Sequence, residues 1–232
     1  MRLTLRALAL LMGYPSAELK AHAGEIRDTL ADDGALPPAS RRALEPLITA
    51  LEREDLLDLQ AAYSELFDRS RALSLHLFEH VHGESRERGQ AMIDLAGQYM
   101  NAGCLLDSGE LPDFIPVFVE YASCLPPNEA RETLAEPGHV FAALEERLRE
   151  RGSGYAGVLA ALVVLGGVRL DREALAELQE NAPSEDPARI DAEWEEAPVT
   201  FTQHDMGGPT GMTAKLRAAG KAMVAARRSG GA

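Results

Sequence analysis

The sequence predicts an all-α protein built as a single-domain bundle of roughly nine or ten helices. Three observations predict this class. Leucine and alanine are abundant while aromatic residues are only 5% of the chain. Apolar residues recur at intervals of three and four, and segments that alternate apolar and polar residues are almost absent. We expect one helical domain over residues 1–180 and a flexible tail over residues 181–232.

The first third of the chain predicts four helices in succession. The opening MRLTLRALALLMGYPSA is interrupted by Arg6, so it is too short for a signal peptide, and we expect a largely buried first helix. The next three helices are predicted by apolar stripes. These stripes are Leu19, Ile26 and Leu30 behind a Ser16 cap, then Leu44, Leu47, Ile48 and Leu51 around Pro46, then Leu56, Leu59, Tyr63 and Leu66.

Further helices are expected along the rest of the chain, after a break at Gly83. One begins near Ser85 and shares a face among Met92, Leu95, Ala96 and Tyr99. Another should start at Pro112, with Asp113 in its first turn, and run to about Cys124. The remaining helices are indicated by PNEARETLAE, by Phe141, Leu144 and Leu148, by YAGVLAALVVLGGV as a central helix, and by DREALAELQE behind an Asp171 cap.

Charge and composition restrict the partners of the chain. Thirty-seven acidic residues against 23 basic residues give a formal net charge of −14, which repels phosphate backbones and attracts cations. We therefore expect no nucleic acid partner. After Asn181 the sequence is first acidic and then basic, which predicts a partly disordered tail.

No stretch is long and apolar enough for us to expect stable insertion in a membrane. Cys104 and Cys124 form no CxxC pair and have no histidine at zinc-finger spacing, so we interpret them as reduced thiols. Together these features predict a cytoplasmic protein.

The stretch SLHLFEHVHGESRERGQAM contains the most unusual chemistry of the chain. His76, Glu79 and His80 spell HxxEH, a spacing that could place two imidazoles on one metal and a carboxylate beside a bound water. A metal-dependent hydrolase is therefore one hypothesis. A third protein ligand is needed, however, and residues 151–170 contain no aspartate, glutamate or histidine. The sequence also has no nucleophile elbow, P-loop or dinucleotide fingerprint, so we expect a protein that is not an enzyme.

A groove for a partner helix fits this stretch better than a metal. Polar, ionisable and aromatic side chains are dense between His76 and Arg88, and Asp113 and Glu120 follow on another predicted helix. Leucine and phenylalanine would form the floor of such a groove and carboxylates its rim.

Residues 63–123 resemble a known family along most of their length. The run from YSELFDRS to VFVEYAS is similar to the NarJ-type chaperones, also called the nitrate reductase delta subunit, within the TorD-like redox-enzyme maturation family. Tyr63, Leu66 and Phe67 match its YxxLF element. The acidic-proline element is matched by Glu110, Pro112, Asp113 and Glu120, with Phe114 where wider relatives often have histidine. LLMGYPSAEL and EWEEAPVTF extend the similarity to about Phe201.

The resemblance implies a non-catalytic, cytoplasmic, all-helical chaperone. Such a protein binds the apo catalytic (alpha) subunit of respiratory nitrate reductase at its N-terminus, assists insertion of the molybdenum cofactor and delays membrane docking. We expect no cofactor and no metal in the chain itself, and molybdenum cofactor biosynthesis proteins as further partners. A bundle that binds the pterin directly is disfavoured, because Arg86 and Arg88 alone offer a basic pocket. The expected partner-binding residues are Tyr63, Phe67, Leu75, His76, Phe78, Glu79, His80, His82, Arg86, Arg88, Asp113, Phe114 and Glu120.

Overall fold

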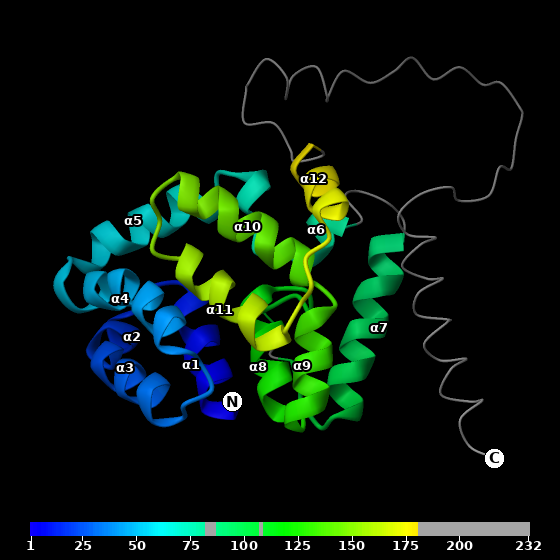
Figure 1. The fold of residues 1–232 in the computed structure, drawn as a ribbon, viewed down its shortest axis with the longest axis horizontal. Helices are drawn as coiled ribbons and strands as arrows, with labels where there is room; N and C mark the ends of the chain where they lie inside the picture. Colours follow the sequence, from blue (N-terminus) through cyan, green and yellow to red (C-terminus); the bar gives the residue numbers. More distant parts are fainter. Residues whose placement is uncertain (82–86, 107–108, 181–232) are drawn as a thin grey trace, which may run out of the picture. The chain divides into compact units, whose positions relative to one another are not determined.

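Helices account for most of the chain that the computed structural model describes, which is residues 1–81, 87–106 and 109–180 (Figure 1). These residues form twelve α-helices and one 3-10 helix, and no strand beyond an isolated bridge. The order is α1 (Arg2–Met12), α2 (Ala17–Ala21), α3 (Ala23–Asp32), α4 (Pro38–Arg53), α5 (Leu56–Phe67), η1 (Arg71–Leu73), α6 (Leu77–Val81), α7 (Glu87–Asn101), α8 (Ile115–Cys124), α9 (Pro127–Ala135), α10 (Gly138–Glu150), α11 (Ala156–Gly166) and α12 (Arg172–Glu180). The predicted all-α class is confirmed.

The helix count exceeds nine or ten because some helices are short or divided. The stretch expected as one helix behind Ser16 is two helices. Ser16 does cap α2, since its side chain accepts a hydrogen bond of 3.0 Å from the Leu19 amide. At His22, however, φ of −104° and ψ of 10° leave the helical range and separate α2 from α3. The predicted break at Gly83, the helix start near Ser85 and the tail of residues 181–232 lie outside the described residues.

The most apolar helix, α11, lies at the centre of the bundle, as its sequence predicts. It contains no charged residue and packs against α10, α9, α4 and α1. Gly157 lets α11 approach α4 closely, because a β-carbon at this position would clash with the main chain of Ala43. No helix in the described ranges has the length and apolar run needed to cross a membrane.

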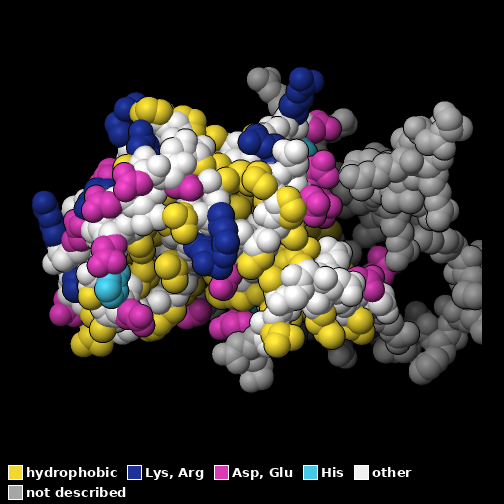
Figure 2. All heavy atoms as spheres, turned by 90° about the horizontal axis from the view of Figure 1, so that it is seen from below, with side chains coloured by type: hydrophobic (Ala, Val, Ile, Leu, Met, Phe, Trp, Pro, Cys, Tyr) yellow, Lys and Arg dark blue, Asp and Glu magenta, His cyan; other side chains and the backbone are white. Residues whose placement is uncertain are grey.

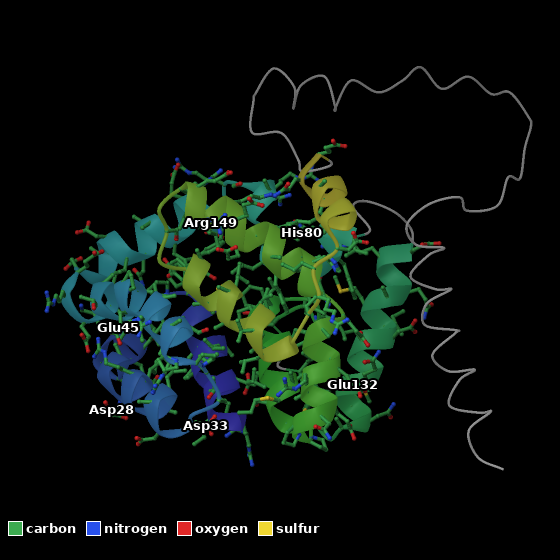
Figure 3. The ribbon with its side chains drawn as sticks, viewed as in Figure 1. Asp28, Asp33, Glu45, His80, Glu132 and Arg149 are labelled. Carbon is green, nitrogen blue, oxygen red and sulfur yellow. The ribbon has the colours of Figure 1, made fainter. Side chains whose placement is uncertain are left out.

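One side of α8 is fixed by its packing against α1. Leu5, Leu8 and Met12 of α1 are buried, as are Phe118 and Val119 of α8. The start of α1 is held by Asp33 (Figure 3), whose carboxylate accepts a hydrogen bond of 3.2 Å from the Thr4 amide and pairs with the amino terminus. α8 also packs against α9, and within α8 only Glu120 and Cys124 are exposed to solvent.

The predicted start of α8 is wrong. The helix begins at Ile115, so Pro112 and Asp113 precede it, and Pro116 is the proline of the first turn. Asp113 does not stabilise the N-terminus of its own helix, because its fully buried carboxylate binds groups before and within α6. The predicted end at Cys124 is confirmed.

Candidate partner-binding site

The segment before α6 is joined to the start of α8 through main-chain contacts. His76 and Phe114 form an isolated antiparallel bridge, and the Leu77 amide donates a hydrogen bond of 3.0 Å to the Asp113 carbonyl. The rings of His76 and Phe114 lie with their centroids 5.4 Å apart. Two parts of the expected site that are distant in sequence thus meet in the structure.

The carboxylate of Asp113 organises this junction. One oxygen accepts a hydrogen bond of 3.2 Å from the Phe78 amide, and the other lies 3.1 Å from Nδ1 of His76. The hydrogen bond to Asp113 raises the pKa of His76 above its ordinary value, although partial burial of the ring opposes the shift. A proton on His76 is therefore balanced by a buried anion and adds little net charge to the surface.

His80 has a different environment from His76. Its Nε2 donates a hydrogen bond of 2.8 Å to the carbonyl oxygen of Ser74, and burial lowers the pKa of the ring. Figure 3 places His80 beside α10. Glu79, next in sequence, accepts a hydrogen bond of 3.3 Å from Arg88 and so links α6 to α7. Glu79 and His80 thus connect neighbouring elements.

This geometry gives no support to the HxxEH hydrolase hypothesis. The helix begins at Leu77, so His76 does not share a helix face with His80, and the two rings bind Asp113 and the Ser74 carbonyl instead of a common point. Over residues 1–81, 87–106 and 109–180, no three histidine, cysteine or acidic side chains are grouped so that they could hold a metal ion. His82 and Arg86 lie outside these ranges.

Tyr63 and Phe67 lie in the core and not on the surface. Both are buried, and their rings pack with that of Tyr155 at centroid distances of 5.8 and 5.1 Å. The Tyr63 hydroxyl donates a hydrogen bond of 3.1 Å to the Met12 carbonyl. Above this cluster lies Tyr14, which is 53% exposed and 5.3 Å from Tyr63. Tyr63 and Phe67 therefore lie beneath the exposed side chain of Tyr14 and pack against it from the core. Leu75, another residue expected at the site, is also buried.

The outward side of α8 runs between two hollows. Phe114, Val117, Glu120 and Cys124 follow one another at intervals of three and four, so they lie along one side of the helix. Both hollows are lined by Val117 and Glu120. One, of about 520 Å³, is completed by Tyr99, Gly103, Cys104, Leu105, Leu106, Glu110, Tyr121 and Cys124. The other, of about 510 Å³, is completed by Arg6, Ala9, Leu10, Gly13, Tyr14, Ser16, Leu19 and Pro116. We call the two hollows together the α8 groove.

The α8 groove combines exposed apolar side chains with carboxylates. Leu10 is 57% exposed and Leu105 is 89% exposed. Glu110 and Glu120 are also exposed, and neither forms an ion pair within the described part of the chain. Figure 2 shows one face of the molecule on which hydrophobic side chains reach the surface among acidic and basic ones. Apolar surface of this kind is typical of protein-binding sites.

Sequence reasoning found only part of this groove. Glu120 was among the expected site residues, but Leu10, Tyr14, Val117 and Leu105 were not. Tyr14 could have been found in the segment LLMGYPSAEL, which is similar to the family. It stands between a glycine and a proline at the end of a helix, where a tyrosine is poorly placed for burial. Nothing local to Leu105 distinguishes it from a core leucine.

Comparison with known proteins identifies the family. The family model described as nitrate reductase delta subunit matches residues 33–161, more than half of the chain. The chain belongs to this family. The matched residues include α4 to α10, the bridge between His76 and Phe114, and the α8 side of the groove.

Curated relatives support the family assignment. The chain is 43% identical over 208 residues to the nitrate reductase molybdenum cofactor assembly chaperone NarJ of Escherichia coli K12, covering 89% of this chain and 88% of the relative. It is 40% identical over 201 residues to the probable chaperone NarW of the same organism, covering 86% and 84%. Identity to the probable NarJ chaperone of Bacillus subtilis is 27% over 165 residues, covering 70% and 87%.

Proposed function

We propose that this chain is a cytoplasmic assembly chaperone for respiratory nitrate reductase. It binds the N-terminal segment of the apo catalytic (alpha) subunit and keeps that subunit competent for molybdenum cofactor insertion before membrane docking. The names of the relatives support the nitrate reductase system. The observation that carries the proposed binding mode is the α8 groove, with apolar walls and two carboxylates that form no ion pair with a described residue. The chaperone itself is non-catalytic, and cofactor biosynthesis proteins form a second class of partner.

The length of the groove suits a short helix. From Phe114 to Cys124 the outward side of α8 extends about 15 Å, which is the length of roughly ten helical residues. An amphipathic helix could lay its apolar stripe between Leu10 and Leu105, over Val117. Basic residues at the edges of that stripe would then lie near Glu110 and Glu120.

Burial and charge have separate roles in this mode of binding. Exposed leucine and tyrosine side chains lose contact with water when the helix docks, so apolar burial supplies most of the affinity. The carboxylates and the net charge of −14 mainly accelerate the approach of a basic segment. The groove can thus hold a helical N-terminal segment without recognising its whole sequence.

Calorimetry with a synthetic peptide tests the proposed function. The peptide comprises the N-terminal segment of the catalytic subunit from the same organism, and it should bind the full chain with a negative heat-capacity change. Its association rate should fall as salt is raised. Glu120→Lys should weaken binding about tenfold, or about 1.4 kcal/mol, because one charge at the centre of the groove is reversed.

The matched control is Glu132→Lys on α9, which makes the same charge change at an exposed residue that lines neither hollow (Figure 3). This control should bind within about twofold of the wild type. An equal loss of peptide affinity in the two variants would show that the overall charge of the chain causes the effect, and that the peptide does not bind in the groove. Absence of any binding heat with the wild type at tens of micromolar peptide would refute the proposed peptide recognition.

A further inference from the structure

The two hollows of the α8 groove differ in the charges that line them. The hollow that reaches Cys124, the last residue of α8, is lined by Glu110 and Glu120 and by no described basic side chain. The hollow that reaches Pro116, in the first turn of α8, contains Arg6. Glu120 lines both hollows, so the difference between them rests on Arg6 and Glu110. An occupant of the groove therefore meets a cation at one end and an anion at the other.

Arg6 and Glu110 are both available to a partner. Both are exposed, and neither has an ion-pair partner among residues 1–81, 87–106 and 109–180. No acidic residue precedes Glu18 in the sequence, and Asp33, the acid bonded to α1, is already paired with the amino terminus. The positive charge of Arg6 is thus not balanced by a carboxylate of its own helix.

A helix that binds in this groove also has two unlike ends. Its first N–H groups lack acceptors and carry partial positive charge, while its last carbonyl groups lack donors and carry partial negative charge. Glu110 offers acceptor oxygens at one end of the groove. Arg6 and the hydroxyl of the exposed Tyr14 offer donors at the other end. The groove therefore complements the two ends of a helix in only one direction.

The dipole of α8 favours the same direction. The end of α8 that lies at the Glu110 hollow is its carboxyl end, and the end that lies at the Arg6 hollow is its amino end. A helix that runs antiparallel to α8 places its own dipole ends beside ends of opposite sign. The side chains and the main chain of the groove thus agree on one orientation.

We propose that the N-terminal helix of the catalytic subunit binds antiparallel to α8, with its amino end at Glu110 and its last turn at Arg6. This orientation rests on the proposed function, and it makes Arg6 the residue that selects for carbonyl groups or an acidic side chain in the last turn of the partner. The amino group of an N-terminal segment adds to the attraction at Glu110. In the reverse orientation that amino group would lie beside Arg6 and the last carbonyls beside Glu110, so like charges would meet at both ends.

Double-mutant cycles with capped and uncapped peptides test the orientation. Two catalytic-subunit peptides differ only at the amino end, which is free or acetylated, and two differ only at the carboxyl end, which is free or amidated. Each peptide titrates the full wild-type chain, Glu110→Gln and Arg6→Gln in a calorimeter at neutral pH. The helix propensity of each peptide cancels, because the same peptides are compared on every protein.

The two ends of the peptide should respond to different variants. The affinity ratio of the free to the acetylated amino end should fall about threefold in Glu110→Gln and stay unchanged in Arg6→Gln. The affinity ratio of the free to the amidated carboxyl end should fall about threefold in Arg6→Gln and stay unchanged in Glu110→Gln. The controls Glu132→Gln and Arg131→Gln remove the same charges at exposed residues that line neither hollow, and they should change neither ratio.

The other outcomes separate the orientation from the proposed function. If the two variants exchange their effects, the peptide binds in the groove but runs parallel to α8. If neither ratio changes in either variant, Arg6 and Glu110 do not recognise the ends of the helix, and the orientation is overturned while peptide binding stands. If no peptide binds the wild type, the proposed function fails and the orientation fails with it.

Discussion

Two hollowed regions of the surface differ in how their charges are satisfied. The hollow between α3 and α4, of about 430 Å³, contains Arg27 and Glu45. Nε of Arg27 lies 3.0 Å from a Glu45 oxygen, and the same guanidinium donates a hydrogen bond of 2.9 Å to Glu52. Figure 3 labels Asp28 and Glu45 in this region. In the α8 groove, by contrast, Glu110 and Glu120 form no ion pair with any described residue.

A hollow that contains charged side chains is therefore not by itself a binding site. The charges between α3 and α4 already stabilise the packing of those helices. The α8 groove has carboxylates and exposed apolar side chains that do not satisfy one another, so a partner can still gain by covering them. Substitutions in the first kind of region should lower stability, and substitutions in the second should lower affinity.

The largest expected effect is at Asp113, whose charge is fully satisfied and buried. Asp113→Ala leaves the Phe78 amide and the His76 ring without their acceptor, and it should lower the free energy of unfolding by about 3 kcal/mol. Denaturant unfolding monitored by circular dichroism measures this loss. Asp113→Asn retains the shape and one acceptor and should lose about half as much. A change below about 0.5 kcal/mol for the alanine variant would contradict the anchoring role of Asp113.

A smaller effect is expected at Arg27. Arg27→Ala removes the link between α3 and α4 and should cost about 1 kcal/mol of stability, because the paired side chains are partly exposed. The same variant should bind the catalytic-subunit peptide as the wild type does. Unfolding and calorimetry on one preparation measure both quantities. Weaker peptide binding by a folded Arg27→Ala chain would show that the hollow between α3 and α4 also contributes to peptide affinity.

The smallest expected effect is the pH dependence contributed by the two histidines. The raised pKa of His76 supplies stability that is fully present below its unfolded pKa of about 6.5 and is lost as the pH rises through the folded pKa. For His80 the pKa is lowered by burial, so its contribution is lost as the pH falls below about 6.5. Each histidine should change the free energy of unfolding by about 1 kcal/mol or less across this pH range.

Unfolding free energies of His76→Gln and His80→Gln at pH 5.5 and pH 7.5, on either side of about 6.5, measure these opposite contributions. His76→Gln should cost more stability at the lower pH, and His80→Gln should cost more at the higher pH. The same pH dependence in both variants would show that the two rings do not have the distinct environments described for them.

The fold could be predicted from the sequence where the position of a residue depends only on its burial or on its neighbours in sequence. The apolar stretch of α11 contains no charge, so it could only be a buried helix, and the stripe of α5 similarly predicted its helix. Ser16 capped the helix expected after it because capping depends on neighbours in sequence. The start of α8 was missed because Asp113 binds the α6 segment, a contact between residues far apart in sequence.

The sequence predicted the kinds of side chains in the candidate site better than it predicted where they lie. Dense polar and aromatic residues directed attention to the segment after His76, and the structure places His76 beside Asp113 and Phe114. The same reasoning expected Tyr63 and Phe67 at the partner, whereas the structure buries them below Tyr14. The groove also needs Leu10 of α1 and Leu105 after α7, and no local pattern in either segment indicates that they converge on Glu120.

Crosslink mapping of the bound peptide shows whether the partner occupies the outward side of α8. A catalytic-subunit peptide with a photoreactive group at one apolar position is bound to the full chain, irradiated and located by mass spectrometry. Crosslinks should fall on groove residues such as Tyr14, Val117 and Leu105, and an excess of unlabelled peptide should abolish them. Crosslinks that gather instead around Pro38 and Arg41, in the hollow between α3 and α4, would show that the peptide does not bind at α8.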